Sequence, residues 1–427
     1  MKTIRKIVVA VMVGILSVPL LTSCSTPAQL VKPAPTFFPP APNEPRIQYL
    51  TGFSSSKIVE DTKNSFFFFL SGAQQGDQTF TLMKPFGIAV YKGIIYVSDT
   101  GSDTVYRIDL VNKKFEPLKG NTGYGRLKKP VRLTVDESGN LYVTDTTRKE
   151  IVVFTPEGDY LKAYGKGIAS KGVAAAVDLE NVYILDQKDL DIKVIDRKSG
   201  LLVKSIGESS DSFSGFIYPS DMTMDSEGFL YVTDIGSGVV AKFDKDGHTV
   251  LTFGQLGDAL GEFARPKGIG VDAGGVIYVV DSGLQTVQLF NQDGRLLMFF
   301  GDRSLTPGSM NLPTSIWLSR DNLDYYKQFA DPSFESEYLI FIINQYGSGA
   351  ENVSIYGFGH KKEGIGAEPG TEAPPTNVNP APGAPVSEPK PAPAAEKSAT
   401  EPKPAPAATK SATEPVKGDA SRESRTP

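Results

Sequence analysis

One pattern of about 46 residues recurs six times along the middle of this chain, and no other feature limits its fold as strongly. Each copy holds an apolar strand that opens with proline, or with Gly172 in copy three, then a turn, a second strand that ends in aromatic-apolar-x-Asp or, in copy six, in Asn344, and a third strand. The copies begin at Lys84, Lys129, Gly172, Tyr218, Arg265 and Leu312. The opening prolines Pro85, Pro130, Pro219, Pro266 and Pro313 lie 45, 89, 47 and 47 residues apart, the longest interval covering two units. Six matches in register indicate a repeat architecture.

The second strand of every copy ends in a short polar side chain. These residues are Asp99, Asp145, Asp186, Asp234, Asp281 and Asn344, and an aromatic residue lies three positions before each: Tyr96, Tyr142, Tyr183, Tyr231, Tyr278 and Phe341. Five carboxylates in one column could suggest a metal or catalytic site. We favour a structural role, because an Asp at the end of a strand readily accepts N–H bonds from the following turn.

A β-rich unit of this length has the size of one propeller blade. Turns with Gly join strands one and two at 136–139, 225–228 and 272–275, and strands three and four at 156–158, 244–247 and 291–294. Gly and Asp tolerate the positive φ that such hairpin turns need. Fourth strands follow at 160–165, 249–254 and 295–301. The sequence therefore predicts an all-β fold, a six-bladed β-propeller with four-stranded antiparallel blades.

The repeats resemble the NHL family of six-bladed propellers. The resemblance rests on Pro-x-Gly-Ile-x-Val at Pro85 and Pro266, on Tyr-Val-x-Asp second strands, and on the connector from Phe253-Gly254 to Pro266. It covers residues 46–360 and implies the fold, while many functions share such a scaffold. Family repeats often place Asn and Arg shortly after the Asp. Here those positions read Ser102 and Thr104, Arg148 and Glu150, and Gly283 and Thr286, so a binding mode that needs this Arg column is not implied.

The last blade lacks a fourth strand in the chain that follows it. Copy six ends near residues 353–359 in its third strand, whereas residues 46–53, before copy one, have the pattern of an unpaired strand. Pairing the two would complete the blade and remove two exposed sheet edges. We predict this closure by the N-terminal strand; the alternative is a seventh, partial blade.

The N-terminus has the features of a secretory signal. Lys2, Arg5 and Lys6 precede an apolar run from residue 7 to residue 21, which is short for a membrane span of about 20 residues. Residues 21–24, Leu-Thr-Ser-Cys, resemble the lipobox of bacterial lipoproteins, which implies cleavage after residue 23 and lipid attachment to Cys24. Ser25 stands where an Asp would suggest inner-membrane retention, so the resemblance implies the outer membrane. The alternative is a secreted protein that keeps its one Cys.

Two Pro-rich segments flank the repeats. Residues 24–45 contain many prolines, and we expect an extended tether there. Residues 361–427 contain a 13-residue duplication, 388–400 and 401–413, and almost no large apolar residue. Such a tail cannot bury a core, so we expect it to be disordered. It is either a passive solubilising tail or a segment that touches peptidoglycan or a partner.

Candidate site residues come from the predicted channel. Two residues after the opening position, the innermost strands carry Gly87, Arg132, Ala174, Asp221, Gly268 and Ser315. Only Asp221 is acidic, so a Ca²⁺ site built from this ring lacks ligands. Arg132 and Asp221 are candidates for ligand binding, with a space-filling ion pair at the channel mouth as the alternative. Lys267, in the opening strand of copy five, is a third candidate.

Two segments interrupt the repeat pattern. An insertion at 320–336 in copy six contains Tyr325, Tyr326 and Phe329, which we expect either to contact a partner or to pack on the blade. The run Asn-Ser-Phe-Phe-Phe-Phe-Leu at 64–70 is too short to span a membrane. We expect a turn or plug packed on the propeller there, and the alternative is a membrane-inserting or partner-binding patch.

Composition narrows the function. The chain has one Cys and two His, which leave no internal disulfide and no His-based metal cluster, and it has no Cys-x-x-Cys-His motif for attaching haem. A net charge of −5 disfavours nucleic acid as a partner. We therefore predict a lipid-anchored, monomeric envelope protein without cofactor or metal, whose propeller is a non-catalytic protein-interaction or assembly scaffold. The alternatives are a propeller hydrolase or lactonase and a small-ligand or glycan sensor. By analogy with similar NHL lipoproteins of metal-reducing bacteria, the partner could be a multihaem cytochrome system.

Overall fold

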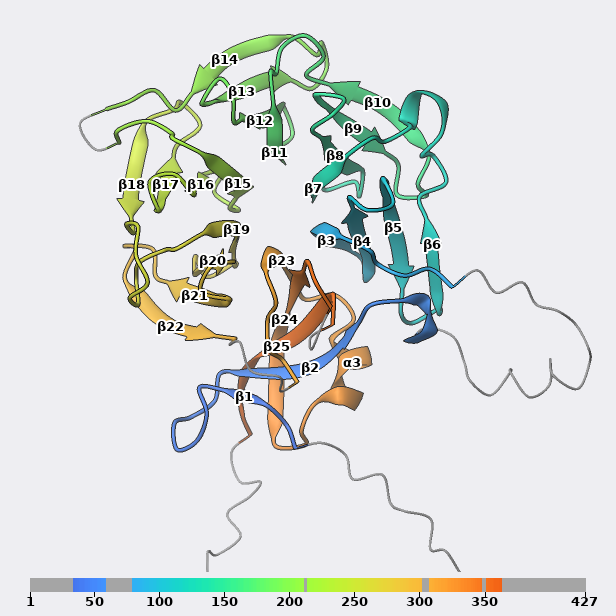
Figure 1. Ribbon diagram of the computed structural model, residues 1–427, viewed down its shortest axis with the longest axis vertical. Coiled ribbons are helices and arrows are strands. Elements are labelled where there is room, and N and C mark those ends of the chain that lie inside the picture. Colours follow the sequence, from blue (N-terminus) through green and yellow to red (C-terminus); the bar gives the residue numbers. More distant parts are fainter. Residues whose placement is uncertain (1–33, 59–78, 211–212, 302–306, 348–350, 363–427) are drawn as a thin grey trace, which may run out of the picture. The chain divides into compact units, whose positions relative to one another are not determined.

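The computed structural model describes residues 34–58, 79–210, 213–301, 307–347 and 351–362, which form six β-sheets around a common axis (Figure 1). The chain divides into two units, Met1–Ala367 and Glu368–Pro427, and every described residue belongs to the first. The signal peptide, Cys24, the run at 64–70 and the tail beyond residue 362 lie outside the described residues. Within the described part, no helix is long and apolar enough to cross a membrane.

The fold is a six-bladed propeller, as the repeat predicts. Blade 1 contains β3 (Pro85–Tyr91), β4 (Ile94–Asp99), β5 (Thr104–Asp109) and β6 (Lys114–Pro117); blade 2 contains β7 (Pro130–Val135), β8 (Leu141–Asp145), β9 (Glu150–Phe154) and β10 (Tyr160–Tyr164). Blade 3 contains β11 (Gly172–Val177), β12 (Asn181–Asp186), β13 (Asp191–Asp196) and β14 (Leu202–Ile206); blade 4 contains β15 (Pro219–Met224), β16 (Leu230–Asp234), β17 (Val239–Phe243) and β18 (Thr249–Phe253). Blade 5 contains β19 (Pro266–Val271), β20 (Ile277–Asp281), β21 (Thr286–Phe290) and β22 (Leu296–Phe300), and blade 6 contains β23 (Pro313–Ser319), β24 (Phe334–Asn344), β25 (Val353–Lys361), β2 (Ile47–Phe53) and β1 (Phe37–Phe38).

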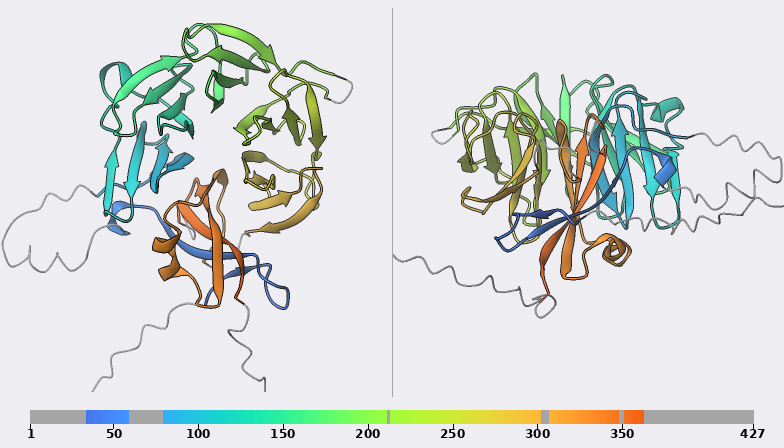
Figure 2. Two further views of the ribbon diagram at one scale, coloured as in Figure 1. Left: turned by 180° about the vertical axis from the view of Figure 1, so that it is seen from behind. Right: turned by 60° about the horizontal axis from the view of Figure 1, so that its bottom comes forward.

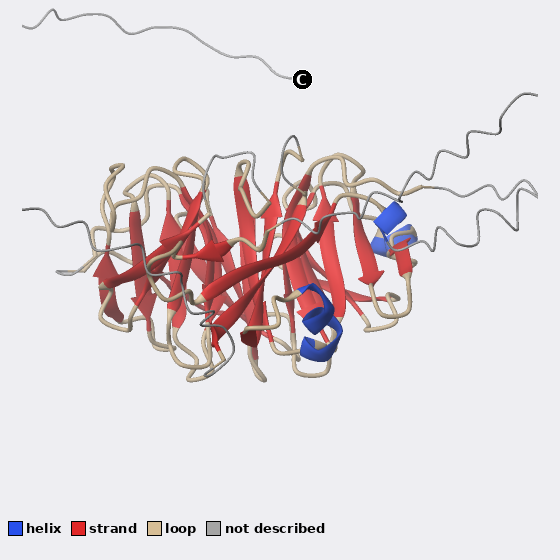
Figure 3. Ribbon diagram, turned by 90° about the horizontal axis from the view of Figure 1, so that it is seen from below, coloured by secondary structure: helices blue, strands red, loops and turns tan. Residues whose placement is uncertain are grey.

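The strands run between two loop-bearing faces (Figure 3). We call one the connector face: it carries the links from each blade to the next and the turns between second and third strands. The other, the turn face, carries the turns between strands one and two and between strands three and four. Because each chain segment enters its blade through the innermost strand, every blade presents equivalent residues at the same face.

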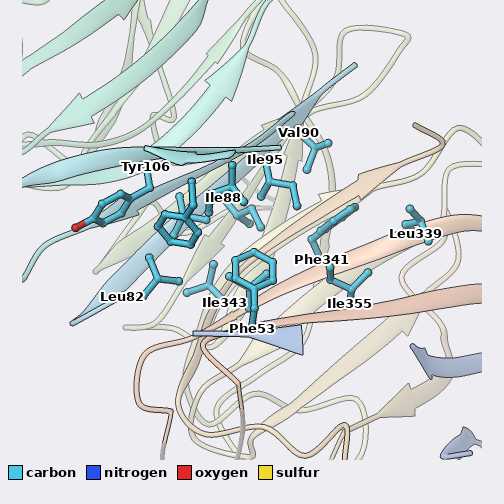
Figure 4. Packing of buried hydrophobic residues seen from close by; sticks show 14 of the residues in the cluster. Phe53, Leu82, Ile88, Val90, Ile95, Tyr106, Leu339, Phe341, Ile343 and Ile355 are labelled. Carbon is cyan, nitrogen blue, oxygen red and sulfur yellow. The ribbon is translucent and has the colours of Figure 1, made fainter. Parts of the chain in front are cut away.

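Burial explains why the second strands are almost wholly apolar. β8 is buried at all five positions, because both faces of a blade pack against neighbouring blades, whereas the outer strand β10 is largely exposed. At the junction of blades 6 and 1, Phe53, Ile88 and Phe341 belong to one continuous cluster of buried side chains (Figure 4). Burial of side chains of this size stabilises the fold by about 1.5–3 kcal/mol each.

The N-terminal strand closes the ring, which confirms the predicted closure. β2 pairs antiparallel with β25, from Ile47 opposite Phe358 to Phe53 opposite Val353, and supplies the fourth strand of blade 6. No sheet of a seventh blade is present among the described residues. Figure 2 shows from two further directions that β2 lies beside strands from the opposite end of the propeller sequence.

The predicted boundary between tether and propeller at residue 45 is too late. β1 pairs with β2 and adds a fifth strand to blade 6. The ring of Phe37 lies 5.7 Å from that of Phe334, and the ring of Phe38 lies 6.0 Å from that of Phe300. The proline content of this segment suggests a tether, but its two Phe side chains bury apolar surface on the blade.

The column of aspartates holds the blades to their connectors. Asp281 accepts four backbone N–H bonds, from Ala264 at 2.8 Å and Arg265 at 3.0 Å before the blade, and from Gly283 at 2.8 Å and Leu284 at 3.0 Å after the strand. Asp99, Asp145, Asp186 and Asp234 repeat this arrangement. We call each an aspartate clamp; the predicted structural role of the column is confirmed.

Removing one clamp should destabilise the propeller strongly. In Asp281→Ala, four backbone donors lose their carboxylate acceptor, and an unsatisfied buried donor costs about 1–3 kcal/mol. We expect the free energy of unfolding to fall by about 3 kcal/mol or more, measured by urea denaturation followed by fluorescence. Asp293→Ala is the control, because Asp293 lies exposed in a turn of the same blade; it should change stability by less than about 0.5 kcal/mol. Equal losses in the two variants would contradict a clamping role.

Candidate functional site

The innermost strands β3, β7, β11, β15, β19 and β23 surround the axis of the propeller (Figure 1). Each lies at the end of its sheet and pairs with a strand on one side only, so its other edge faces the channel. Side chains of neighbouring blades bond to these edges: the hydroxyl of Ser98 donates to Val131 O at 2.6 Å, and that of Thr314 donates to Phe86 O at 2.8 Å. The channel wall is therefore built from inner strands that adjacent blades hold in register.

Arg132 crosses this channel near the connector face. It rises from β7 of blade 2, and its Nε lies 3.0 Å from Asp221 Oδ1 of blade 4. Its Nη1 donates to Thr314 O of blade 6 at 2.7 Å, and its Nη2 donates to Lys267 O of blade 5. The guanidinium carbon lies 4.9 Å from the centre of the Phe86 ring in blade 1. One side chain thus joins five of the six blades.

Asp221 completes the closure of the channel. Its carboxylate accepts backbone N–H bonds from Met222 at 2.9 Å and from Ile269 of blade 5 at 3.2 Å. Arg132 is only 4% exposed and Asp221 only 6%. The remaining members of the column are small, and a Cβ on Gly87 would lie 2.2 Å from Val131 O. The geometry matches the ion-pair alternative stated for these two residues, because their polar atoms bond within the protein.

Burial dominates the electrostatics of this pair. Loss of solvation raises the pKa of Asp221 to about 6, although the charge of Arg132 acts in the opposite direction. Burial likewise lowers the pKa of Arg132, and Asp221 offsets part of that effect. Burial and the nearby charges of Arg132, Arg265 and Lys84 lower the pKa of Lys267 to about 8. Positive charge is therefore concentrated where the channel meets the connector face.

A cavity of about 240 Å³ extends from the pair toward the turn face. Its walls are formed by the later residues of the inner strands, among them Val135, Val177, Met224, Val271 and Leu318. Among the described residues that line it, Arg132 and Asp221 are the ionisable ones. Hydroxyls of Thr134, Thr223 and Ser315 also line it, without a His or a second carboxylate beside them. This set supplies neither an activated nucleophile nor several oxygen ligands for a cation.

Three potential metal ligands gather on the turn between β17 and β18. Ligand atoms of Asp244, Asp246 and His248 lie within 4.8 Å of one another. Asp244 Oδ1, however, accepts N–H bonds from Gly247 and His248, and its Oδ2 lies 2.9 Å from the His248 ring. The cluster is placed on the turn face by a hairpin turn, and its bonds stabilise that turn.

The structure separates the predicted site residues into two groups. Arg132, Asp221 and Lys267 come together at the channel, whereas Tyr325, Tyr326 and Phe329 lie in the insertion of blade 6. There α3 (Leu323–Tyr326) and η3 (Lys327–Phe329) pack on the cluster that joins blades 6 and 1. Tyr326 is only 4% exposed, and Tyr325 and Phe329 are partly buried against the same cluster. Of the two alternatives stated for the insertion, Tyr326 follows the second and packs on the blade, so its assignment as a binding residue is corrected.

The residues that the sequence reasoning missed lie in the connectors. Ile217 and Leu260 are 61% and 62% exposed, Leu256 is 55% exposed, and Tyr218 is also exposed. We call these four residues the connector patch. Ile217 and Leu256 flank the same turn of blade 4, since a Cβ on Gly236 would lie 2.5 Å from Ile217 Cγ2 and one on Gly238 would lie 2.5 Å from Leu256 N. Large apolar residues outside the strand pattern were the signal that could have found them.

No family model and no curated protein matches this chain. Among solved structures, a virginiamycin B lyase from Staphylococcus aureus is similar with a TM-score of 0.44 and 16% identity over 62% of this chain and 79% of that chain. A gluconolactonase from Xanthomonas campestris gives 0.47 and 16% over 77% and 99%, and a protein of unknown function from Bacteroides thetaiotaomicron gives 0.49 and 17% over 65% and 70%. The assignment of a six-bladed propeller rests on the strand topology itself.

Removing the guanidinium should destabilise the propeller in a pH-dependent way. Arg132→Met leaves the buried carboxylate of Asp221 without its cation, which raises its pKa further. When the pKa of a carboxyl group is higher in the folded than in the unfolded state, the group adds to stability at low pH. This contribution is lost as the pH rises through the folded-state pKa. We expect Arg132→Met to lose about 3 kcal/mol of unfolding free energy at pH 8 and less at pH 5, measured by urea denaturation.

A second variant separates charge from packing in this test. Arg132→Met/Asp221→Asn removes both charges, so at pH 8 it should be more stable than Arg132→Met alone. A loss in Arg132→Met that is the same at pH 5 and pH 8, with no recovery in the double variant, would contradict the assignment of Asp221 as a charge balanced by Arg132.

Proposed function

We propose that this protein is a non-catalytic interaction scaffold of the bacterial envelope, held at the membrane by a lipid on Cys24. One observation carries the proposal: the connector patch exposes large apolar side chains on one face, while the charged groups of the channel are engaged with each other and with the backbone. A protein that exposes contiguous apolar side chains commonly uses them to bind another protein.

The distribution of exposed apolar residues supports the connector face as the binding face. Met83 and Tyr124 are also exposed there, in the links that enter blades 1 and 2. On the turn face, the described turns expose the large apolar residues Val111, Leu179 and Leu201, and Tyr160, Leu202 and Val203 are exposed where the outer strands β10 and β14 begin. The aspartate clamps hold the connectors in a fixed conformation. The exposed side chains of the connectors therefore lose little conformational entropy when a partner binds.

Channel chemistry favours a scaffold over the alternatives. A lactonase with a channel Ca²⁺ needs several oxygen ligands, and the described lining residues offer one carboxylate, which Arg132 occupies. The small-ligand alternative is supported by one observation, the cavity of about 240 Å³ between the ion pair and the turn face. Its lining lacks an unengaged charged group among the described residues, so we place partner binding first.

The proposed anchor would keep the propeller close to the membrane. Residues 25–33 separate Cys24 from the first described residue, and the chain is bonded to blade 6 from Thr36 onward. Nine residues at about 3.1 Å each reach about 28 Å. This is less than half the reach that a tether extending to residue 45 would have, so partners would be bound near the membrane surface.

Charge on the connector patch should abolish partner capture. Ile217→Asp/Leu256→Asp adds two carboxylates to exposed positions, which removes the apolar contact without disturbing the core. We expect a partner that is crosslinked to the tagged wild-type protein in its native cells, and identified by mass spectrometry, to be lost at least tenfold. Leu297→Asp is the matched control, since Leu297 is an exposed apolar residue on the outer strand β22. Equal capture by all three proteins would contradict the proposed binding face.

Replacing the proposed lipid site should release the protein from the membrane. Cys24→Ala removes the thiol to which acyl chains would be attached, and stable anchoring needs more than one chain. We expect the variant to move from the outer-membrane fraction to the soluble fraction after cell fractionation and immunoblotting. Ser25→Ala is the control, because it changes a residue next to Cys24 and keeps the thiol. Retention of Cys24→Ala in the membrane fraction would contradict the anchor.

A further inference from the structure

Four cations surround the point where the channel meets the connector face: Lys84, Arg132, Arg265 and Lys267. We call them the cation cluster. Arg132 and Lys267 share the ring of Phe86, at 4.9 Å from its centre to the guanidinium carbon and 6.0 Å to the ammonium nitrogen. Arg132 is buried, and Lys267 is half-buried. Lys84 and Arg265 are exposed and directly precede the opening prolines of blades 1 and 5.

Few acidic side chains in the described part of the chain offset the positive charge of this cluster. Asp221 pairs with Arg132, and no other member of the cluster has an acidic side chain within 4.0 Å among the described residues. The clamp aspartates Asp99 and Asp281 keep their negative charge, but they bond to the backbone N–H groups of Lys84 and Arg265 and form no ion pair with the side chains of these residues. Burial is the main cause of the lowered pKa of Lys267, and the charges of Arg132, Arg265 and Lys84 lower it further. Like charges held together without a counter-charge destabilise a fold, so such a cluster suits the binding of an anion.

Equivalent positions of the repeat place further positive charges around the end of the channel at the connector face. The residue before the opening position is Lys84, Lys129, Lys171 or Arg265 in four of the six blades, and all four are exposed. On the turn face, a cavity of about 640 Å³ has an acidic lining: it contains six carboxylates, among them Glu137, Glu180 and Glu227, and two lysines, Lys204 and Lys245. The two faces of the propeller therefore select different partners by charge.

The cation cluster is continuous with the connector patch. Arg265 of the cluster ends the connector that carries Leu256 and Leu260, and Lys171, a further cation of this face outside the cluster, has its ammonium 5.9 Å from the centre of the Tyr218 ring. A ligand that covers both would place anionic groups at the channel mouth and apolar groups over blade 4. Three of the four patch residues are not aromatic, which disfavours the stacking platform that single-stranded nucleic acid uses.

We propose that the connector face binds an acidic polypeptide segment of a partner, with its carboxylates at the cation cluster and its apolar side chains on the connector patch. The inference rests on the proposed scaffold function and names the chemistry of the partner. Carboxylates from the segment supply the counter-charge that the described residues lack, and Lys267 gains an anion beside its ammonium.

A peptide pair tests the charge requirement directly. The probes are fluorescein-labelled (Glu-Glu-Leu)₄ and its neutral counterpart (Gln-Gln-Leu)₄, titrated with the soluble propeller chain by fluorescence anisotropy at 50 and 300 mM NaCl. We expect saturable binding of the acidic peptide, at least tenfold weaker binding of the neutral one, and weakening with salt. Lys84→Gln/Lys267→Gln should weaken binding of the acidic peptide at least tenfold. Lys198→Gln/Lys204→Gln, which removes two charges away from the connector face, should leave it unchanged.

Three results would overturn the inference. They are acidic-peptide binding that is absent or equal in both double variants, tighter binding of the oligonucleotide dT₁₂ that Lys84→Gln/Lys267→Gln abolishes, and concentration-dependent self-association that the same substitutions abolish in sedimentation. The second would assign the cluster to nucleic acid and the third to the acidic turn face of another copy. If partner capture still depends on Ile217 and Leu256 while the acidic peptide fails to bind, the scaffold stands and only the chemistry of its partner is wrong.

Discussion

Five buried carboxylates hold this propeller together, one in each of blades 1 to 5. Each aspartate clamp ties the residues that enter a blade to the turn that follows its second strand, as Asp281 does for Ala264, Arg265, Gly283 and Leu284. The innermost strand therefore starts at a fixed height in each of these five blades. That height places Arg132 level with Lys267 O, Thr314 O and Asp221, and it fixes the connectors that carry the exposed residues of the binding face.

Blade 6 departs from the repeat and closes the ring. Asn344 replaces the aspartate, and its amide accepts one N–H bond, from Asn311, while it donates to Glu351 O and Ser354 Oγ. The blade gains other support: β2 and β1 come from the far end of the chain, and the insertion packs Tyr326 into the junction with blade 1. Arg132 adds a link across the axis, at the desolvation cost that burial of two charges entails.

Sequence alone predicted the parts of this structure that repeat. The repeat period predicted six blades, and the aspartate column predicted the structural role of the clamps. The missing fourth strand of copy six predicted that residues 46–53 close the ring. Segments that occur once carried no such signal. The proline content of residues 34–45 concealed the pairing of Phe37 and Phe38, and the aromatic insertion looked the same whether Tyr326 was buried or exposed. The position of Arg132 and Asp221 in the repeat predicted that both lie at the channel. The contact of Arg132 with Thr314 O could not be predicted in this way, because it needs small residues at the equivalent positions of other blades. The connector patch depends on two glycines in a turn remote in sequence from Ile217.

We propose that the connector face is the surface with which this scaffold binds its partner. Hydrogen–deuterium exchange of the protein in native outer-membrane preparations, compared with the purified protein, tests it most directly. We expect slower exchange of backbone amides at 118–129, 213–218 and 254–265 in the membrane preparation, and unchanged exchange in the turns at 136–140 and 225–229. Protection confined to the turn face, or identical exchange in the two preparations, would contradict it.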